Sequence, residues 1–381
     1  MTLPIVLLGS PRSGTTWIGK VFDSHPAVLY RHEPDRIDKG QGIPQVLDLA
    51  ESTAALPAGR DWFGRLLRMR HFEVNAIPPF FPKQWTGRAD RSRRAWQSGA
   101  RWVGEASNRA GLRLPLEVPD TIDLDRTVDV VPVLKSVSGL GRARLFHDAS
   151  DGWLVLMLRH PCGYVASIRR GMTERRMRGA FYAEALSTTV PARGRGLTVE
   201  TLFQLGETAR YATNWGLWND HALAVLDGAA RVVVVSYDAL TRDPQEGTRR
   251  LFAAVGLSWS TQTEAFLDSL SRLPSTARYF SIARNPAGQS ERWRRDLTDD
   301  EIASIEREVE QTEAYRLHQH LADADVLPLA DARLALQCAP ARVTLSIPSA
   351  GLPPAHMIEQ ATTAADNATV RPSAVGGARY A

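Results

Sequence analysis

The chain has 381 residues, of which 44% are hydrophobic and 23% are charged, as in an ordinary globular protein with a sizeable core. No apolar run approaches the roughly 18–20 residues that cross a bilayer, and no basic segment precedes the apolar residues 3–8, so we expect neither a transmembrane segment nor a signal peptide. Two cysteines, Cys162 and Cys338, exclude a disulfide framework or a cysteine zinc site. These features predict a reduced, cytoplasmic protein.

The net charge of +4 conceals one basic segment. Residues 60–113 hold 12 basic and four acidic side chains, an excess of +8, whereas the rest of the chain carries a net charge of −4. This distribution argues against a general nucleic-acid coat and favours one local surface that faces an anion.

Short apolar runs bounded by turn residues predict strands, and longer amphipathic runs predict helices. The predicted strands cover residues 3–8, 27–30, 130–134, 153–158 and 231–236. A helix is expected directly after Gly14, and others over residues 163–170, 200–226, 244–255 and 298–318. Because strands alternate with helices, we predict an α/β fold with a parallel sheet flanked by helices.

Two regions fall outside this alternation. Residues 40–125 are rich in arginine, proline and aromatic residues, and we interpret them as an insertion over the sheet. Residues 347–381 contain 21 Ala, Gly, Pro, Ser or Thr among 35, too few bulky apolar groups to anchor a core. We therefore expect a single domain over residues 1–325, including the insertion, and a C-terminal extension over 326–381 that is partly disordered beyond 347.

A glycine-rich loop of sequence GSPRSGTT, residues 9–16, lies between the first strand and the first helix. In that setting backbone N–H groups point toward a phosphate at the helix N-terminus. A nucleoside-triphosphate loop has lysine after its last glycine, but here Thr15 occupies that position and the cation, Arg12, comes earlier. The loop is suited to one 5′-phosphate with Arg12 beside the attached group. The alternative is a purely structural turn.

Residues 10–17 resemble the 5′-phosphosulfate loop of the sulfotransferases that use 3′-phosphoadenosine 5′-phosphosulfate, in the arginine form of the bacterial and carbohydrate branches. Three further segments resemble the family in the same order: Arg159 with Ser167 eight residues later, residues 235–240 around Tyr237, and Trp293-Arg294. The matches run from residue 3 to about 300 and leave residues 40–125 and the C-terminal tail uncovered. It implies the sulfotransferase fold, which is similar to that of P-loop NTPases.

The resemblance also implies a set of residues that bind the cofactor 3′-phosphoadenosine 5′-phosphosulfate: Arg12, Ser13, Gly14, Thr15, Thr16, Trp17, Arg159, Ser167, Tyr237 and Arg284. Arg159 at a strand end offers a bidentate fork for the 3′-phosphate, and Ser167 adds a hydroxyl. Tyr237 is expected near the adenine, although an aromatic residue there also suits the core. Arg284 is the weakest match, and a plain surface arginine is an equal alternative.

The implied reaction is an in-line, metal-free transfer of a sulfuryl group, in which the protein positions the reactants and stabilises charge. Arg12 and Lys135 are the candidate stabilisers. Lys135 is one of only four lysines and follows the predicted strand 130–134, where a lysine that merely extends to solvent is the alternative.

The base is expected to be Glu33. Aryl and steroid sulfotransferases have a histidine shortly after the corresponding lysine, whereas Ser136 follows Lys135 here. The Glu33-Pro34 turn resembles that of carbohydrate sulfotransferases, in which the glutamate is thought to act as base. His32 is the reserve, on the opposite side if the strand persists. A plain salt bridge of Glu33 to Arg31 or Arg36 is the alternative.

The acceptor is expected to be a hydroxyl, or as second choice an amine, of a small-molecule, glycan or glycolipid-type compound. The insertion is the expected acceptor lid, because its arginines suit anionic groups and its aromatic residues suit rings. These aromatic residues are Trp62, Phe63, Phe72, Phe80, Phe81, Trp85, Trp96 and Trp102. The alternative is a solvated basic surface over buried aromatics.

Three other functions remain open: a P-loop nucleotide kinase, an arginine-rich RNA-binding protein and, if Glu33 and Lys135 are peripheral, a protein that binds the cofactor without catalysis. A kinase needs a lysine in the loop, and this chain has Thr15 at that position. An RNA-binding function leaves the glycine-rich loop unexplained. We expect no nucleic-acid partner.

Overall fold

The computed structural model describes residues 3–112, 114, 116–118, 122, 129–174, 181–273, 285–286, 288–321 and 325–338. The chain divides into two units, residues 1–338 and 339–381, and the second lies outside the described residues. The predicted disorder beyond 347 therefore concerns residues of which nothing is described.

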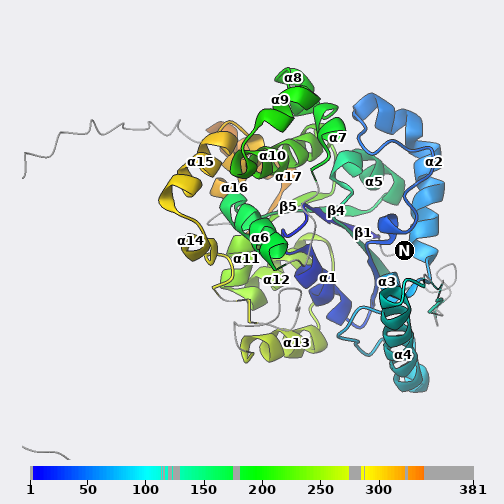
Figure 1. Ribbon diagram of the computed structural model, residues 1–381. Coiled ribbons are helices and arrows are strands. Elements are labelled where there is room, and N and C mark those ends of the chain that lie inside the picture. The colour runs from blue at the N-terminus through cyan, green and yellow to red at the C-terminus, as the bar shows by residue number, and fades with distance from the viewer. Residues whose placement is uncertain are drawn as a thin grey trace, which may run out of the picture. The chain divides into compact units, whose positions relative to one another are not determined.

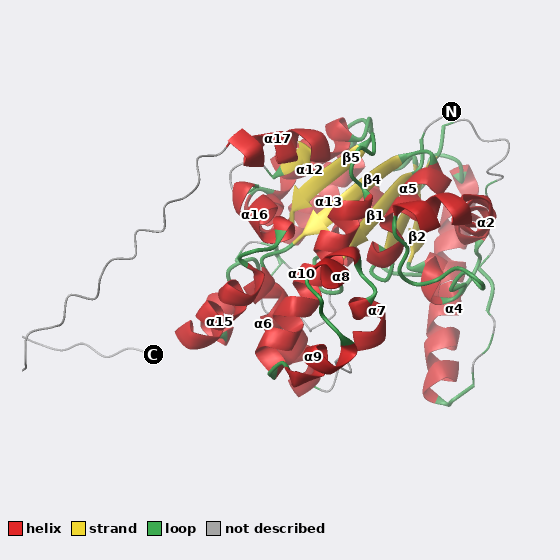
Figure 2. Ribbon diagram, turned by 90° about the horizontal axis from the view of Figure 1, so that it is seen from above, coloured by secondary structure: helices red, strands yellow, loops and turns green. Residues whose placement is uncertain are grey.

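Within the described residues, one sheet of six strands forms the centre of the first unit (Figures 1 and 2). Its strands are β1 Ile5–Gly9, β2 Val28–His32, β3 Val131–Ser136, β4 Trp153–Leu158, β5 Val232–Ser236 and β6 Val326–Pro328. They lie in the order β2-β3-β1-β4-β5-β6, and the first five run parallel. The predicted α/β fold is confirmed. The short β6 is the exception to the parallel prediction, since it pairs antiparallel with β5.

Helices cover both faces of the sheet (Figure 1). They are α1 Thr15–Ser24, α2 Leu49–Arg68, α3 Phe72–Asn75, α4 Asp90–Arg109, α5 Ala143–Ser150, α6 Pro161–Thr173, α7 Ala183–Ser187, α8 Val190–Gly194, α9 Val199–Gln204, α10 Glu207–Val225, α11 Tyr237–Arg242, α12 Pro244–Ala254, α13 Thr261–Ser271, α14 Trp293–Asp296, α15 Asp299–Val309, α16 Glu313–His320 and α17 Leu329–Cys338. In β1, Val6 and Leu8 join the core under α5, α6 and α10, while Ile5 and Leu7 join the core under α1, α12 and α13. Burial on both faces explains why this strand is continuously apolar.

Two predicted helices are each divided in the structure. The predicted helix 200–226 consists of α9 and α10, separated at Leu205 and Gly206, whose backbone is extended. The predicted helix 298–318 consists of α15 and α16, because Thr312 begins a new helix by accepting a hydrogen bond from the Tyr315 N–H at 3.3 Å. Uninterrupted hydrophobic periodicity across these short breaks concealed them.

Residues 40–125, the predicted insertion, contain α2, α3 and α4. Helix α2 packs on α5 and contributes Trp62, Phe63 and Leu66 to the core. Helix α3 lies beside the edge strand β2, and Phe72 is buried next to it. In both ribbon views α4 extends away from the sheet (Figures 1 and 2). Trp62, Phe63 and Phe72 are therefore core residues, and an acceptor would have to meet the other aromatics of this region.

The last described residues continue the sheet. Residues 326–338, which the sequence assigned to an extension, form β6 and α17, and α17 buries Leu329 and Ala332 in the core. None of the helices in the described part of the chain is both long enough and apolar enough to cross a membrane.

Candidate active site

The glycine-rich loop connects the carboxyl end of β1 to the first turn of α1. Arg12 and Gly14 both have positive φ angles, of 71° and 92°. A Cβ atom on Gly14 would lie 2.1 Å from Cδ2 of Tyr237, so the ring of that tyrosine rests directly on the loop. Glycine is thus required here both by the backbone conformation and by the close approach of the ring.

Arg159 and Ser167 meet the loop at Arg12. The Arg159 guanidinium donates to the carbonyl oxygen of Arg12 at 2.7 Å, and Nε of Arg12 donates to the Ser167 hydroxyl at 3.1 Å. Arg159 leaves the end of β4, and Ser167 lies two turns along α6, so the spacing of eight residues brings both side chains to one place. The guanidinium carbon of Arg159 also lies 5.0 Å from the centre of the Tyr237 ring.

Three buried polar atoms around this loop have no hydrogen-bond partner within the described residues: Oγ of Ser13, Nε1 of Trp17 and Nε of Arg159. A buried polar atom without a partner is costly, and few occur in native proteins. Because all three can donate a hydrogen bond, they fit a ligand rich in acceptor oxygens. This is the chemistry of a phosphorylated nucleotide.

Two aromatic side chains adjoin these atoms. The rings of Trp17 and Tyr237 meet edge to face, with centroids 6.3 Å apart and planes at 87°. Both side chains are buried, and both belong to the core on the α1 face of the sheet. They therefore pack in the core and border the loop at the same time, so the two alternatives from the sequence do not exclude one another.

Lys135 lies on β3, which pairs with β1, and Glu33 directly follows β2, the next strand on that side of the sheet. Lys135 is the fifth residue of β3, one residue beyond the predicted strand end, and its ammonium is completely buried. It pairs with Oε1 of Glu33 and lies 3.2 Å from the hydroxyl of Thr16. The loop lacks a lysine at Thr15, and Lys135 brings a cation to the loop from another strand.

The Lys135 charge controls the ionisation of Glu33. Burial by itself would raise the pKa of Glu33, but the neighbouring charges, Lys135 first among them, outweigh this effect and lower it to about 2. Arg36 contributes a second ion pair, at 3.0 Å from the other carboxylate oxygen. Arg31 does not pair with Glu33; it donates to the carbonyl of Leu67. Glu33 is thus ionised over the physiological pH range.

His32 lies beside Glu33, which differs from the expectation that the two side chains point to opposite sides. Strand β2 does extend through His32, but Glu33 has a left-handed backbone with φ of 47°, which ends the strand alternation. Nε2 of His32 is 3.8 Å from Glu33, and Nδ1 is 3.0 Å from the Tyr30 hydroxyl. Burial lowers the pKa of His32 to about 3, so the imidazole is neutral.

Asp35 and Ser136 were not singled out from the sequence, yet they adjoin the ion pair. The Ser136 hydroxyl donates to Asp35 at 2.6 Å, and burial raises the pKa of this aspartate to about 6. Each follows a predicted site residue, by two positions after Glu33 and by one after Lys135. Their proximity along the chain was the available signal.

Residues far along the chain close the other side of the site. The Trp293 ring stacks on the ring of His160, the residue that follows Arg159, with ring centroids 4.5 Å apart. Asp238 accepts hydrogen bonds from the His160 N–H at 2.7 Å and from Nε2 of His318 at 2.8 Å. Asp238 follows Tyr237, but no sequence signal marked His318, which is 80 residues away. Arg284, the remaining predicted residue, lies outside the described residues.

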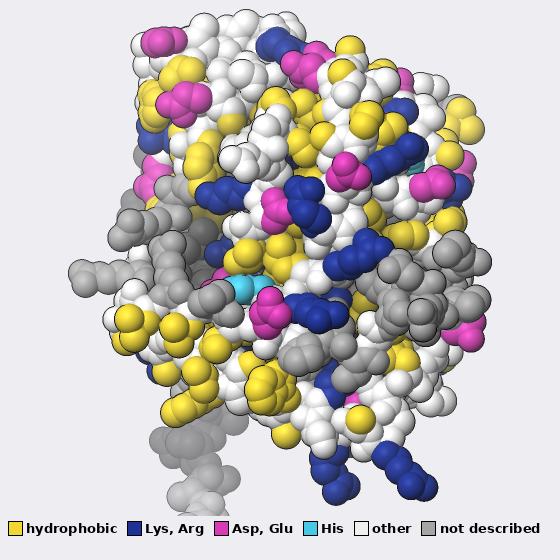
Figure 3. All heavy atoms as spheres, turned by 90° about the vertical axis from the view of Figure 1, so that its right-hand side faces the viewer, with side chains coloured by type: hydrophobic (Ala, Val, Ile, Leu, Met, Phe, Trp, Pro, Cys, Tyr) yellow, Lys and Arg dark blue, Asp and Glu magenta, His cyan; other side chains and the backbone are white. Residues whose placement is uncertain are grey.

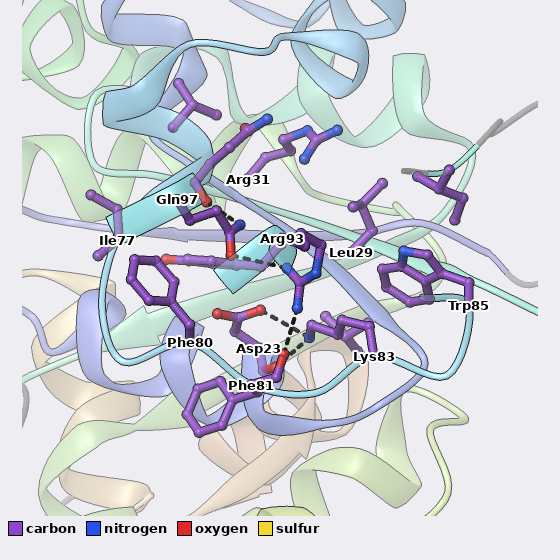
Figure 4. A pocket seen from close by; sticks show the side chains of 15 residues that line it. Asp23, Leu29, Arg31, Ile77, Phe80, Phe81, Lys83, Trp85, Arg93 and Gln97 are labelled. Atoms are coloured by element: carbon purple, nitrogen blue, oxygen red, sulfur yellow. Dashed lines mark hydrogen bonds and ion pairs between the residues drawn. The ribbon is translucent and has the colours of Figure 1, made fainter. Parts of the chain in front are cut away.

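A small pocket lies between β2, α4 and residues 77–85 of the insertion (Figure 4). Its wall includes Asp23, Tyr30, Phe80, Phe81, Lys83, Trp85 and Arg93. Two of its cations are paired, since Lys83 lies 2.9 Å from Asp23 and Arg93 lies 2.8 Å from Asp90. The open space is about 40 Å³, enough for a few water molecules.

Comparisons with known proteins identify the family of the chain. The sequence model of the sulfotransferase family matches residues 4–261. None of the curated proteins compared with the chain is significantly similar to it. Among solved structures, the sulfotransferase domain of the Synechococcus PCC 7002 olefin synthase has 15% identity over 81% of this chain and 95% of that chain, with a TM-score of 0.36. Sulfotransferase STF9 from Mycobacterium avium has 16% identity over 86% of this chain and 78% of that chain, with a TM-score of 0.38.

These structural likenesses are too low to carry a conclusion by themselves. The family match is of a different kind, because it covers more than half of the chain and includes the loop, β3 with Lys135, β4 with Arg159, and β5 up to Tyr237. On that basis the chain belongs to the sulfotransferase family.

Proposed function

We propose that the protein uses 3′-phosphoadenosine 5′-phosphosulfate as donor and transfers its sulfuryl group to a hydroxyl, or less readily an amine, of a small-molecule, glycan or glycolipid-type acceptor. The observation that carries the donor assignment is the group of unpartnered donors at Ser13, Trp17 and Arg159 around the loop. The acceptor assignment rests on the family and on the composition of the insertion.

The residues that meet at the loop divide into three groups in this proposal. The backbone of residues 13–16 and the Arg12 side chain hold the 5′-phosphosulfate end. Arg159 and Ser167 hold the 3′-phosphate, and Trp17 and Tyr237 border the adenine. When bound, the donor supplies the sulfuryl group with a phosphate leaving group. Arg284 stays a prediction for the 3′-phosphate.

Glu33 takes the acceptor proton, and Lys135 and Arg12 stabilise negative charge. A carboxylate with a pKa of about 2 is a weak base, so Glu33 can accept a proton only when its ion pair with Lys135 is weakened. An anion that binds the Lys135 ammonium weakens this ion pair and so raises the pKa of Glu33. His32 is the reserve base, and its contact with Tyr30 favours a supporting role.

The insertion covers the acceptor. Its removal, the direct test, would also remove Trp62, Phe63 and Leu66 from the core, so a point change is preferable. Trp85→Ala at the wall of the pocket in Figure 4 is expected to raise the acceptor KM and to leave donor binding unchanged. Equal weakening of donor and acceptor binding would contradict the assignment of the insertion as acceptor lid.

The cytoplasm is the proposed location of the protein, and the buried Cys162 is expected to stay a free thiol there.

Calorimetry tests the donor. Titrations of the purified protein with 3′-phosphoadenosine 5′-phosphate, ATP and AMP are expected to give tight binding of the bisphosphate alone. Arg159→Ala should abolish it, whereas Arg195→Ala, which changes an exposed arginine at the end of α8, should not. Binding of ATP with Mg²⁺ in place of the bisphosphate would favour the kinase. RNA binding that weakens with salt and is unchanged in Arg159→Ala would favour an RNA-binding function.

A further inference from the structure

Helix α4 of the insertion is amphipathic in the inverse sense. Its residues that are buried against the protein are polar or small: Asp90, Gln97, Gly104 and Ser107. Its solvent side carries an apolar stripe, which we define as Ala95, Trp96, Gly99, Trp102 and Val103. Trp96 is 58% exposed, Trp102 73% and Val103 40%. A surface helix of a globular protein ordinarily has the opposite arrangement.

The contacts of α4 prevent the stripe from turning inward. A Cβ atom on Gly104 would lie 2.4 Å from the Phe72 ring, so the helix is packed closely against α3 at this glycine. The amide of Gln97 donates to the Asn75 carbonyl at 2.9 Å, and Arg93 donates to the Phe81 carbonyl at 2.7 Å. These contacts set the rotation of the helix. The two tryptophans are thus held in solvent by the fold.

Basic groups accompany the stripe. Arg88 and Arg91 are exposed, and neither forms an ion pair with a described residue. The Arg109 side chain is 78% exposed and pairs with Glu105 at 3.5 Å. On the side of the molecule that carries the insertion, basic side chains are spread from top to bottom, with acidic and hydrophobic groups among them (Figure 3). An anionic surface complements this combination of charge and apolar groups.

We propose that α4 binds the surface of a membrane that contains anionic lipids, with the stripe at the level of the headgroups. Tryptophan favours this interface, and arginines beside it attract anionic lipid. A second copy of the chain is a poorer occupant, because pairing two α4 helices would bring their arginines together. The inference is independent of the proposed transfer reaction, and its test measures binding without activity.

The test is flotation of the full chain with vesicles of phosphatidylcholine alone and of phosphatidylcholine mixed with phosphatidylglycerol. The protein is expected to float with the mixed vesicles at low salt and to be released by high salt. The double variant Trp96→Ser/Trp102→Ser should lower the partition coefficient about tenfold or more, because two indoles leave the interface. Tyr182→Ser, which changes an aromatic side chain that is 60% exposed elsewhere, is the matched control.

Circular dichroism of each variant checks that it is folded, which is expected because both tryptophans are exposed. Absence of flotation with mixed vesicles would overturn the proposal. So would equal binding to neutral vesicles, or an equal loss in Tyr182→Ser. A dimer of the wild-type chain in sedimentation that the double variant abolishes would assign the stripe to a second copy instead.

Discussion

Glu33 and Lys135 leave adjacent parallel strands and form a buried ion pair in which Lys135 also reaches Thr16 of the loop, at 3.2 Å. The backbone supports the pair, since the Glu33 N–H donates to the carbonyl of Lys135 at 2.8 Å. One cation thus stands between the candidate base and the glycine-rich loop. An anion that binds at the loop close to Lys135 is therefore expected to raise the pKa of Glu33.

Glu33→Gln is expected to lower kcat for sulfuryl transfer by about 10²–10⁴-fold, because the amide cannot take a proton. Binding of 3′-phosphoadenosine 5′-phosphate, measured by calorimetry, should change little. Arg36→Gln is the matched control, since it removes a partner of Glu33 whose own side chain is 62% exposed. Near-normal turnover in Glu33→Gln, with a large loss in His32→Asn, would assign the proton transfer to His32.

Gly14→Ala is expected to destabilise the fold and to abolish bisphosphate binding. A positive φ costs a non-glycine residue about 1–2 kcal/mol, and the new methyl group would also overlap the Tyr237 ring. Gly42→Ala separates the two effects, because Gly42 has a φ of 81° but nothing within 4 Å of the added Cβ. Denaturant unfolding should show a clearly larger loss for Gly14→Ala. Equal losses would mean that Tyr237 does not press on the loop.

His318→Ala is expected to cost about 1–3 kcal/mol of stability, since it removes one of the two hydrogen-bond donors to the buried Asp238 carboxylate. Asp238 also accepts from His160, which follows Arg159, so bisphosphate affinity should fall as well. His320→Ala, on the same helix, is the control. If His318→Ala lowers stability but leaves the affinity unchanged, the histidine has no part in positioning Arg159.

His32 should make stability depend on pH. Burial holds its pKa at about 3 in the folded chain, against about 6.5 when unfolded. As the pH falls below about 6.5, the unfolded chain gains a proton that the folded chain does not, so up to about 1.4 kcal/mol of stability is lost per pH unit until about pH 3. His32→Asn removes this loss, and asparagine can still reach the Tyr30 hydroxyl.

The measurement compares the free energy of unfolding of the wild-type chain with that of His32→Asn, by urea unfolding at pH 7 and at pH 5. The absolute pH dependence is no guide, because Asp35 and Asp220 act in the opposite direction. Burial raises the pKa of each to about 6, so each gains stability as the pH falls below that value. The wild-type curve should fall relative to His32→Asn. Parallel curves would show that His32 titrates normally in the folded chain.

Much of the fold could be predicted because its strands are short apolar runs buried on both faces. The strand 153–158 was predicted with its observed bounds, and the loop was placed between β1 and α1 as found. Boundaries that depend on neighbours were missed. Strand β3 continues to Ser136 because it pairs with β1 up to Leu8, and this pairing partner lies more than 120 residues away in the sequence.

The site residues could be proposed from the sequence because the loop, Arg159 and Tyr237 directly follow predicted strands and Glu33 comes three residues after another, and the carboxyl ends of parallel strands meet at one edge. Their contacts were decided only by the tertiary structure. The strand order places β3, with Lys135, between β2, which leads to Glu33, and β1, which leads to the loop. The charge of Lys135 and of the other nearby cations then lowers the pKa of Glu33. The same holds for α4, whose composition shows two tryptophans but whose packing through Gly104 decides that they face solvent.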